Sequence, residues 1–456
     1  MKMSSTILMR NATPLPVKFQ ASFTILILFC FSCWPSILQA QTCSIGVQLG
    51  TPDSSFDSIF TQNGSGTGLE PAGIPGWTGA DSTYSILLPN GDTAFFFSDS
   101  YIGESPAMTG DGTVATDSNG LRTRQVNCGP PICSPPTNLF HAHNSVVIRN
   151  AVTGTLTTLT GPPDLTNGFS TSYFAPPAAA GSNHFYWMGD SAVVQTDAVG
   201  TKKLWVFLME FDGSFTYYGS AVAQLSLPSM QIETIQPLLN PPTASNINWG
   251  SALWLEGTYG NYTLYIYGMK MTGTQKRPYV AKVNTAGNLL DVANMANWTA
   301  WDGSTWSADT LNAAPIIGNA GDPNNASDSI SDEYNVKKLS TKFGNAYVLI
   351  GMDTTALFGA WKDITLYTAC LPQGPFSAKK VIYSTPETGS NTVPGMVSGQ
   401  TLAGILLTYN PHFHPQFNSK GKLLVSYNLN AANSGDLLFA DSYRPRFVRV
   451  PIKGLQ

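Results

Sequence analysis

The amino-acid sequence predicts an all-β fold, a five-bladed β-propeller made of four-stranded antiparallel blades. Only 11% of the 456 residues are charged, and 42 are glycine and 31 proline, a composition typical of turn-rich β-proteins. No segment has the apolar spacing and the caps of an amphipathic helix. Instead, short apolar runs follow a polar residue at five places along the chain, as expected for five successive blades.

The first blade is predicted to begin with a hairpin that runs from Asp81 to Asp99. Two apolar runs flank the turn sequence Pro-Asn-Gly-Asp at residues 89–92. Asn-Gly between such runs is a strong signal for a two-residue turn, because both residues accept positive φ. Antiparallel pairing about position 90.5 would then bring the two aspartates to the same open end of the hairpin. The expected strands of this blade are residues 84–88, 93–97, 143–148 and 154–159.

Four further strand starts follow at uneven intervals. The polar residues at the five starts are Asp81, Asp190, Asn248, Glu333 and one of His412 and His414. Inner strands of propeller blades converge on one end of a central channel, so these side chains are predicted to share one face. An N-terminal strand near residues 44–49 is expected to complete the last blade and protect its edge.

Several short motifs resemble a known family. They are Gly79–Asp81, Phe97–Tyr101, Trp187–Asp190, Asn248–Ser251, Arg277–Ala281, Glu333–Tyr334 and His412–Pro415. They are similar to the domain-of-unknown-function 4185/5005 group, and the resemblance covers nearly all of the chain after residue 40. It implies an exported five-bladed propeller akin to glycoside hydrolase families 43, 62 and 183, the last containing endo-D-arabinanases. Relatives typically carry Gly-Asp-Thr where this chain has Ser98–Ser100.

Glycoside cleavage needs two carboxyl groups, one that protonates the leaving oxygen and one that activates water or attacks the sugar. The resemblance implies that Asp81 is the base of the first blade and Asp99 its hairpin partner. It implies that Glu333 is the acid and Asp190 a neighbour that tunes the pKa values of the others. A structural role is the alternative, because aspartates beside strands often only cap turns.

Asn248 and four ring-bearing residues are expected to bind substrate. Trp249 and Tyr334 would stack on sugar faces, since their rings suit both apolar and wet contacts. His412 and His414 are two apart in an extended stretch and so point to the same side, which suits sugar hydroxyls, a proton shuttle or a metal. Ordinary hydrogen-bonded positions are the alternative for both histidines. His141 and His143 have the same spacing, but they lie near an expected outer strand, where a structural role is favoured.

No catalytic metal and no cofactor are predicted. Asp322, Asp328 and Asp332 lie in a loop rich in glycine, asparagine and serine. A structural calcium ion is one interpretation of this loop. A solvated loop is favoured, because the spacing of the aspartates differs from that of an EF-hand.

Residues 1–40 are predicted to be a signal peptide. Lys18 precedes an apolar run at residues 23–31, and Ala40 offers a small residue at the cleavage position. The run is short for a membrane span. Removal of this segment would take away three basic residues and no acid, changing the net charge from −4 to −7 and arguing against nucleic-acid binding. The expectation is a secreted or periplasmic, monomeric protein with one domain, residues 41–456.

Export would leave four cysteines in an oxidising compartment, where disulfides are expected. Cys128 and Cys133 are predicted to close a small local loop. That bond would leave Cys43 with Cys370, a pairing that remains open at this point. A zinc site is disfavoured, because no histidine lies at ligand spacing from either pair.

Together these observations predict a secreted glycoside hydrolase that cleaves a furanose-containing (arabinan-like) or related polysaccharide by carboxylate general acid–base catalysis. The alternative is a non-catalytic carbohydrate-binding or cell-surface interaction propeller, in which the same acids only hydrogen-bond sugar hydroxyls. A carboxyl separation of roughly 5–5.5 Å would imply retention of configuration and roughly 6.5–9.5 Å inversion. The sugar, its linkage and endo or exo action remain open.

Overall fold

The computed structural model describes residues 43–60, 76–104, 125–126, 142–162, 170–177, 183–241, 246–393, 396 and 398–455. The chain divides into two units, residues 1–41 and 42–456, and every described residue belongs to the second unit. The predicted signal peptide and the predicted Cys128–Cys133 disulfide lie outside the described residues. No helix among the described residues is long and apolar enough to span a membrane.

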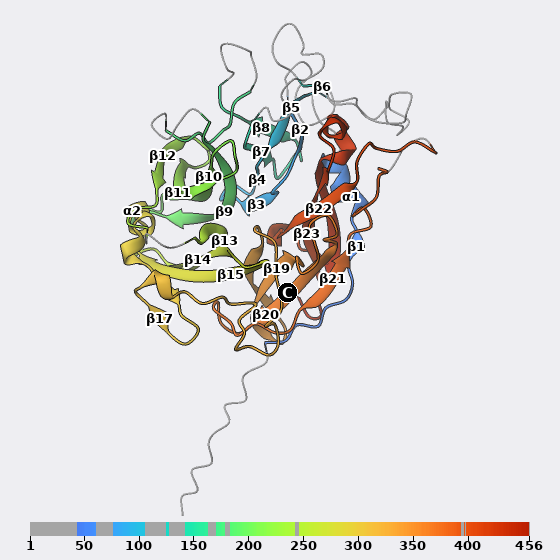
Figure 1. The fold of residues 1–456 in the computed structure, drawn as a ribbon. Coiled ribbons are helices and arrows are strands. Elements are labelled where there is room, and N and C mark those ends of the chain that lie inside the picture. The colour runs from blue at the N-terminus through green and yellow to red at the C-terminus, as the bar shows by residue number, and fades with distance from the viewer. Residues whose placement is uncertain are drawn as a thin grey trace, which may run out of the picture. The chain divides into compact units, whose positions relative to one another are not determined.

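The second unit is the predicted five-bladed β-propeller, whose blades follow one another around a ring from blue to red in Figure 1. Blade 1 contains β3 (Tyr84–Leu87), β4 (Thr93–Phe97), β7 (Ser145–Arg149) and β8 (Leu156–Leu159). Blade 2 contains β9 (Phe185–Gln195), β10 (Lys202–Phe211), β11 (Tyr217–Ser226) and β12 (Ile232–Pro237). Blade 3 contains β13 (Asn248–Thr258), β14 (Asn261–Thr272), β15 (Gln275–Thr285), β16 (Thr299–Trp301) and β17 (Trp306–Ser307).

The remaining sheets complete the ring. Blade 4 contains β18 (Asn335–Thr341), β19 (Gly344–Met352), β20 (Asp363–Ala369) and β21 (Lys380–Ser384). Blade 5 contains β22 (Leu406–Phe413), β23 (Lys422–Ala431), β24 (Arg444–Pro451) and β1 (Thr51–Pro52). A separate sheet contains β2 (Gly76–Ala80), β5 (Ser100–Glu104) and β6 (Gln125–Val126). Blade 3 therefore has five strands, one more than predicted, because the β16–β17 hairpin pairs with the outer edge of β15.

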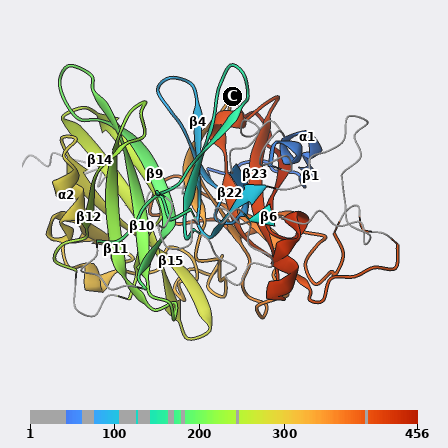
Figure 2. The same ribbon diagram turned by 90° about the horizontal axis from the view of Figure 1, so that it is seen from above.

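The helices are short and lie between strands. They are α1 (Ser54–Asp57), α2 (Leu289–Ala293) and the 3₁₀ turns η1 (Ser58–Phe60), η3 (Met295–Asn297), η4 (Thr310–Asn312), η5 (Pro415–Phe417), η6 (Ser434–Leu438) and η7 (Ala440–Ser442). In Figure 2 the long strands of blades 2 and 3 run side by side.

The first hairpin has the predicted pairing but a longer turn. Tyr84 pairs with Phe96, and Leu87 pairs with Thr93, so the hairpin is centred on Asn90. Its loop covers residues 88–92 instead of the predicted two residues. The Leu88 N–H donates to the Asp92 carbonyl at 2.8 Å, and the Gly91 N–H donates back to the Leu88 carbonyl at 2.9 Å, so the chain reverses over residues 88–91.

The N-terminal segment closes the ring, as predicted, although slightly further along the chain. β1 pairs with β24 through Thr51 and Pro52, whereas residues 44–49 contribute only an isolated bridge, from Val47 to Ile452. A disulfide joins Cys43 to Cys370, the pairing that the sequence left open. Because Cys370 immediately follows β20 of blade 4, this bond ties the start of the domain to its penultimate blade.

The hydrophobic core is divided among the interfaces between neighbouring blades. Tyr84 of blade 1 packs in one cluster with Tyr186 of blade 2, and Trp205 of blade 2 packs in another with Trp249 of blade 3. Further clusters join blades 3 and 4, blades 4 and 5, and blades 5 and 1. Much of each inner strand is therefore buried against its neighbours, which limits the side chains that reach the channel mouth.

Candidate active site

A cavity of about 790 Å³ lies where all five blades contribute side chains. Four of the nine predicted site residues line it: Asp81, Asp99, Asn248 and Glu333. Asp81 and Asp99 come from the open end of the first hairpin, where the backbone N–H of Ser98 donates to the backbone oxygen of Asp81 at 3.2 Å. The hairpin prediction for these two aspartates is thus confirmed.

The backbone is strained directly after Asp81. Ser82 and Thr83 have φ values of 70° and 52°, in the left-handed region that non-glycine residues rarely adopt. Both residues are fully buried, so the surrounding packing holds them there. This turn places the Ser82 hydroxyl 2.6 Å from the Ser98 hydroxyl. The Ser82 hydroxyl donates to Glu333 Oε1 at 2.8 Å. The strained turn thus connects the blade 1 carboxylate to the blade 4 carboxylate.

The Asp81 carboxyl group is held by Tyr409 through one of its two oxygens. The Tyr409 hydroxyl donates to Asp81 Oδ2 at 2.9 Å and accepts a hydrogen bond from the Asn430 amide at 2.9 Å. Asp81 Oδ1 is buried and has no hydrogen-bond partner within the described ranges. Burial and the nearby charge of Asp99 raise the pKa of Asp81 to about 7.

Asp99 is fixed by two ring N–H groups. Its Oδ1 lies 2.9 Å from His143 Nδ1 and 3.1 Å from the donor Trp187 Nε1. The His143 ring stacks on Phe185, with centroids 3.9 Å apart, and the Tyr443 hydroxyl donates to the backbone oxygen of Asp99 at 3.0 Å. His143, for which a structural role was favoured, therefore holds a predicted catalytic residue.

Glu333 lies two residues before β18 and is 6% exposed. Its Oε1 accepts from Ser82, and its Oε2 lies 3.2 Å from His412 Nε2. Burial, followed by the charge of Asp81, raises the pKa of Glu333 well above its usual value. Glu333 and Asp81 are therefore two interacting acids with raised pKa values.

The structure places Asp190 outside this cavity, in a buried ion pair. Its Oδ2 accepts from Lys337 Nζ at 2.7 Å and from the Leu253 backbone N–H at 2.9 Å, and its Oδ1 accepts from the Ser191 N–H at 2.8 Å. These contacts join β9, β13 and β18. The predicted pKa-tuning position near the other acids is instead occupied by Asp99.

The other four predicted substrate-binding residues are also buried away from the cavity. Trp249 packs edge-on against Trp298, and the Tyr334 hydroxyl donates to the Gly268 carbonyl at 2.9 Å. Neither His412 nor His414 is exposed. His414 is bonded between the hydroxyls of Ser85 and Ser426, at 2.6 and 2.9 Å. On β13 neighbouring side chains face opposite sides, so Asn248 reaches the cavity while Trp249 enters the core. Glu333 and Tyr334, just before β18, divide in the same way.

Sequence reasoning missed most of the remaining cavity wall. Its polar part includes Lys276, Asp332, Tyr409, Asn410, Asn430 and Tyr443. Its apolar part includes Trp187, Phe211, Phe215, Met271, Phe358 and Trp361. A usable signal existed for His143, which does not line the cavity but contacts Asp99 behind it. Phe97 pairs with Ser145, so the same register places residue 143 opposite residue 99.

The three aspartates of the suggested calcium loop have separate partners. Asp332 pairs with Lys276, Asp328 lies 3.3 Å from Lys379, and Asp322 accepts from the backbone N–H of Asn324 at 2.9 Å. Among the residues that the structure describes, no three His, Cys, Asp or Glu side chains are grouped as metal ligands.

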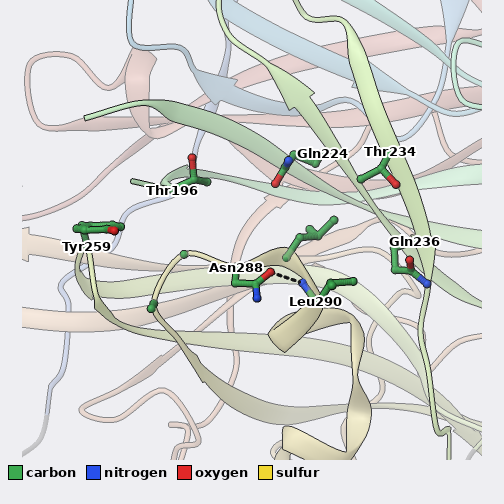
Figure 3. A pocket seen from close by; sticks show the side chains of 10 residues that line it. Thr196, Gln224, Thr234, Gln236, Tyr259, Asn288 and Leu290 are labelled. Carbon is green, nitrogen blue, oxygen red and sulfur yellow. Dashed lines mark hydrogen bonds between the residues drawn. The ribbon is translucent and has the colours of Figure 1, made fainter. Parts of the chain in front are cut away.

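A second cavity, of about 540 Å³, lies between blades 2 and 3 and is lined mainly by neutral side chains (Figure 3). Gln224 is already engaged there, accepting from Trp205 Nε1 at 2.9 Å. Asn288 caps α2 by accepting from the Leu290 N–H at 3.1 Å, the dashed line in Figure 3. None of the described residues that line this cavity carries a carboxyl group, whereas glycosidic cleavage needs two.

Several solved structures are similar to this chain. A "putative hydrolase" from Bacteroides ovatus has a TM-score of 0.59 and 19% identity, covering 89% of this chain and 93% of that chain. An exo-β-1,3-galactanase from Phanerochaete chrysosporium has a TM-score of 0.41 and 8% identity, covering 81% and 60% of the two chains. An α-L-arabinofuranosidase from Podospora anserina has a TM-score of 0.39 and 10% identity, covering 89% and 95%.

A search of curated protein sequences gives no match. Residues 133–452, however, match the model of a family described as a domain of unknown function, DUF5005. The match includes blades 2 to 4 and all but the N-terminal strand of blade 5. It agrees with the 5005 part of the resemblance read from the sequence motifs, while the 4185 part remains a prediction. This chain belongs to the DUF5005 family.

Proposed function

We propose that this protein is a glycoside hydrolase in which Glu333 is the general acid and Asp81 the general base. The observation that carries the proposal is the presence of Asp81, Asp99 and Glu333 in the wall of one cavity shared by all five blades. Carboxyl groups whose environments give them different proton affinities are what glycosidic bond cleavage requires.

Glu333 suits the acid role because burial and the charge of Asp81 raise its pKa well above the usual value. A carboxyl group whose pKa is raised in this way keeps its proton to higher pH than an ordinary carboxyl group and can donate it. In the proposed reaction this proton passes to the glycosidic oxygen while the bond from that oxygen to the anomeric carbon breaks.

Asp81 suits the base role because its pKa is raised to about 7. Its ionised form is a stronger base than an ordinary carboxylate and is available from about neutral pH upward. Asp81 would take a proton from water as the water oxygen bonds to the anomeric carbon. A carboxylate nucleophile is better served by a low pKa, so we expect inversion of configuration at that carbon.

Asp99 is proposed to act through Asp81. Its negative charge is one of the causes that raise the pKa of Asp81, second to burial. His143 and Trp187 hold this carboxylate in place. Asp99 therefore strengthens the base without transferring a proton itself.

We propose a furanose-containing, arabinan-like or related polysaccharide as the substrate, and a secreted or periplasmic location. The motif resemblance supports both. The cavity wall supports a sugar ligand, because Asn248, Asn410 and Asn430 offer amide groups for hydroxyls while Trp187 and Trp361 offer aromatic faces.

The test is a screen of the purified protein against a panel of arabinans, galactans and xylans, with the anomer of the released sugar followed by NMR. Hydrolysis that is lost in Asp81→Asn and retained in Asp92→Asn supports the proposal. Asp92 is a matched control because it lies in the loop at the opposite end of the same hairpin. Saturable glycan binding without turnover would contradict the proposal and favour a carbohydrate-binding propeller, and a retained anomer would make Asp81 the nucleophile.

A further inference from the structure

A chain of buried hydrogen bonds behind Glu333 determines where one proton lies. The backbone N–H of Phe413 donates to Asn335 Oδ1 at 2.6 Å. A backbone N–H needs an acceptor, so this atom of the Asn335 amide is the oxygen and not the nitrogen. The same oxygen lies 3.3 Å from His412 Nδ1. Since an oxygen acceptor faces it, Nδ1 of His412 carries a hydrogen.

The other nitrogen of His412 faces Glu333. Nε2 lies 3.2 Å from Glu333 Oε2. A neutral imidazole with its hydrogen on Nδ1 has a lone pair on Nε2. Two lone pairs repel, so this contact is a hydrogen bond only when a proton lies between Nε2 and Oε2. On the opposite side, Glu333 Oε1 accepts from Ser82, which leaves Oε2 as the oxygen that bears the proton.

The charges around Glu333 and His412 favour a proton bonded to the carboxyl group over one bonded to the imidazole. Asp81, Asp99 and Asp332 face Glu333, and all three oppose its ionisation. His412 is fully buried, and His414 and Lys337 oppose a positive charge on its ring. A protonated carboxyl beside a neutral imidazole therefore carries less electrostatic penalty than an ion pair in the same place.

We propose that His412, oriented by Asn335, is a positioning residue that keeps the acid proton on Glu333 Oε2. His412 was predicted to bind substrate, but in this proposal it acts from behind the cavity wall by orienting the Glu333 proton. The catalytic consequence rests on the proposed function, but the position of the proton does not. Replacing the imidazole by the shorter asparagine side chain should make the carboxylate easier to form, because it removes the lone pair and leaves room beside Oε2 for water, which can donate to it.

The experiment measures the proton in the intact protein without substrate. The chain contains only 5 histidines, so the ¹⁵N signals of His412 can be assigned by single substitutions. We expect a neutral ring with its hydrogen on Nδ1 at neutral pH. Infrared difference spectra between wild type and Glu333→Gln should show a protonated carboxyl group at the same pH. An Nε2–H tautomer, an imidazolium or an ionised Glu333 would each overturn the inference.

Substitutions then test the dependence on His412. In His412→Asn the carboxyl signal should disappear at a pH lower by about one pH unit or more than in wild type. The matched control is His414→Asn, a buried histidine on the same segment that contacts Ser85 and Ser426 instead of Glu333, and it should leave the carboxyl signal unchanged. Equal shifts in both variants would contradict the proposal. If neither variant folds, the wild-type spectra still decide.

Once a substrate is known, the alkaline limb of kcat/KM should move with the carboxyl signal in His412→Asn. A protonated Glu333 in a protein that hydrolyses no glycan would retain the proton assignment and remove the proposed function. Hydrolysis by a protein whose Glu333 is ionised at neutral pH would support the proposed function and remove the proton assignment.

Discussion

Two sets of buried carboxylates lie in or just before the first strands of their blades, and their charges are compensated in opposite ways. Asp190 has Lys337 at 2.7 Å and two backbone N–H donors. Asp81 and Glu333 receive hydrogen bonds from hydroxyl groups, and Glu333 faces a histidine, but neither carboxylate has a Lys or Arg ion pair within the described residues. Burying an unpaired charge costs stability, so the acids that lack a cation are the ones expected to have a function.

The largest effect on stability should come from breaking the ion pair between Asp190 and Lys337. Asp190→Asn leaves Lys337 buried without its carboxylate, and we expect a loss of about 3–5 kcal/mol in the free energy of unfolding. Denaturant unfolding monitored by tryptophan fluorescence measures this. The double variant Asp190→Asn/Lys337→Met removes both charges and should recover much of the loss. If Asp190→Asn folds normally and only abolishes turnover, Asp190 is catalytic and the comparison fails.

The uncompensated acids should behave in the opposite way. Asp81→Asn and Glu333→Gln keep the shape of each side chain, so the fold should be retained. Activity on the true substrate should fall by about 10²-fold or more in each, the usual contribution of a general acid or base. Initial rates and binding isotherms on the same glycan separate turnover from affinity. A variant that retains full kcat excludes that residue from the acid–base pair.

Asp81 also makes stability depend on pH. Its pKa rises from an ordinary value of 3.8 to about 7, so the native state holds the proton more tightly than the unfolded chain. The stability contributed by this group is present below pH 4 and is lost as the pH rises through about 7. Asp81→Asn lacks this dependence. We therefore expect the variant to gain about 1–4 kcal/mol over wild type between pH 4 and pH 8.

Thermal unfolding of the two proteins across this pH range provides the measurement. Asp92→Asn, at the other end of the hairpin, serves as the control and should keep a constant difference from wild type. A difference between Asp81→Asn and wild type that does not change with pH would mean that Asp81 is ionised throughout.

The sequence predicted the parts of the site that depend on local pairing. The register of one hairpin is enough to bring Asp81 and Asp99 together, and a polar residue before an apolar run was enough to find Glu333. Contacts between distant blades left no such signal. Tyr409, for example, reaches Asp81 from the last blade. Within blade 1, by contrast, the register of β4 and β7 could have placed His143 opposite Asp99.

For a related reason, the sequence predicted too many residues at strand starts to line the site. A residue at a strand start was expected to face the channel, yet the inner strands also pack against each other. Trp249 and Tyr334 are consequently core residues, although each directly follows a residue that lines the cavity. The sequence shows where a strand begins more clearly than which of two adjacent side chains faces the cavity.

The smallest predicted effect separates two influences on the pKa of Asp81, the hydrogen bond from Tyr409 and the charge of Asp99. The Tyr409 hydroxyl donates to Asp81 Oδ2, and this contact lowers the pKa of Asp81 against the stronger effects of burial and Asp99. Tyr409→Phe removes the donor but keeps the ring, so the pKa of Asp81 should rise further, by about one pH unit or less. The acidic limb of kcat/KM should then move to higher pH while the rate above it stays within about tenfold of wild type. Asp99→Asn should move the same limb to lower pH, because it removes a negative charge that opposes ionisation of Asp81. Shifts in opposite directions would show that the two neighbours tune one base, and shifts in the same direction would contradict that arrangement.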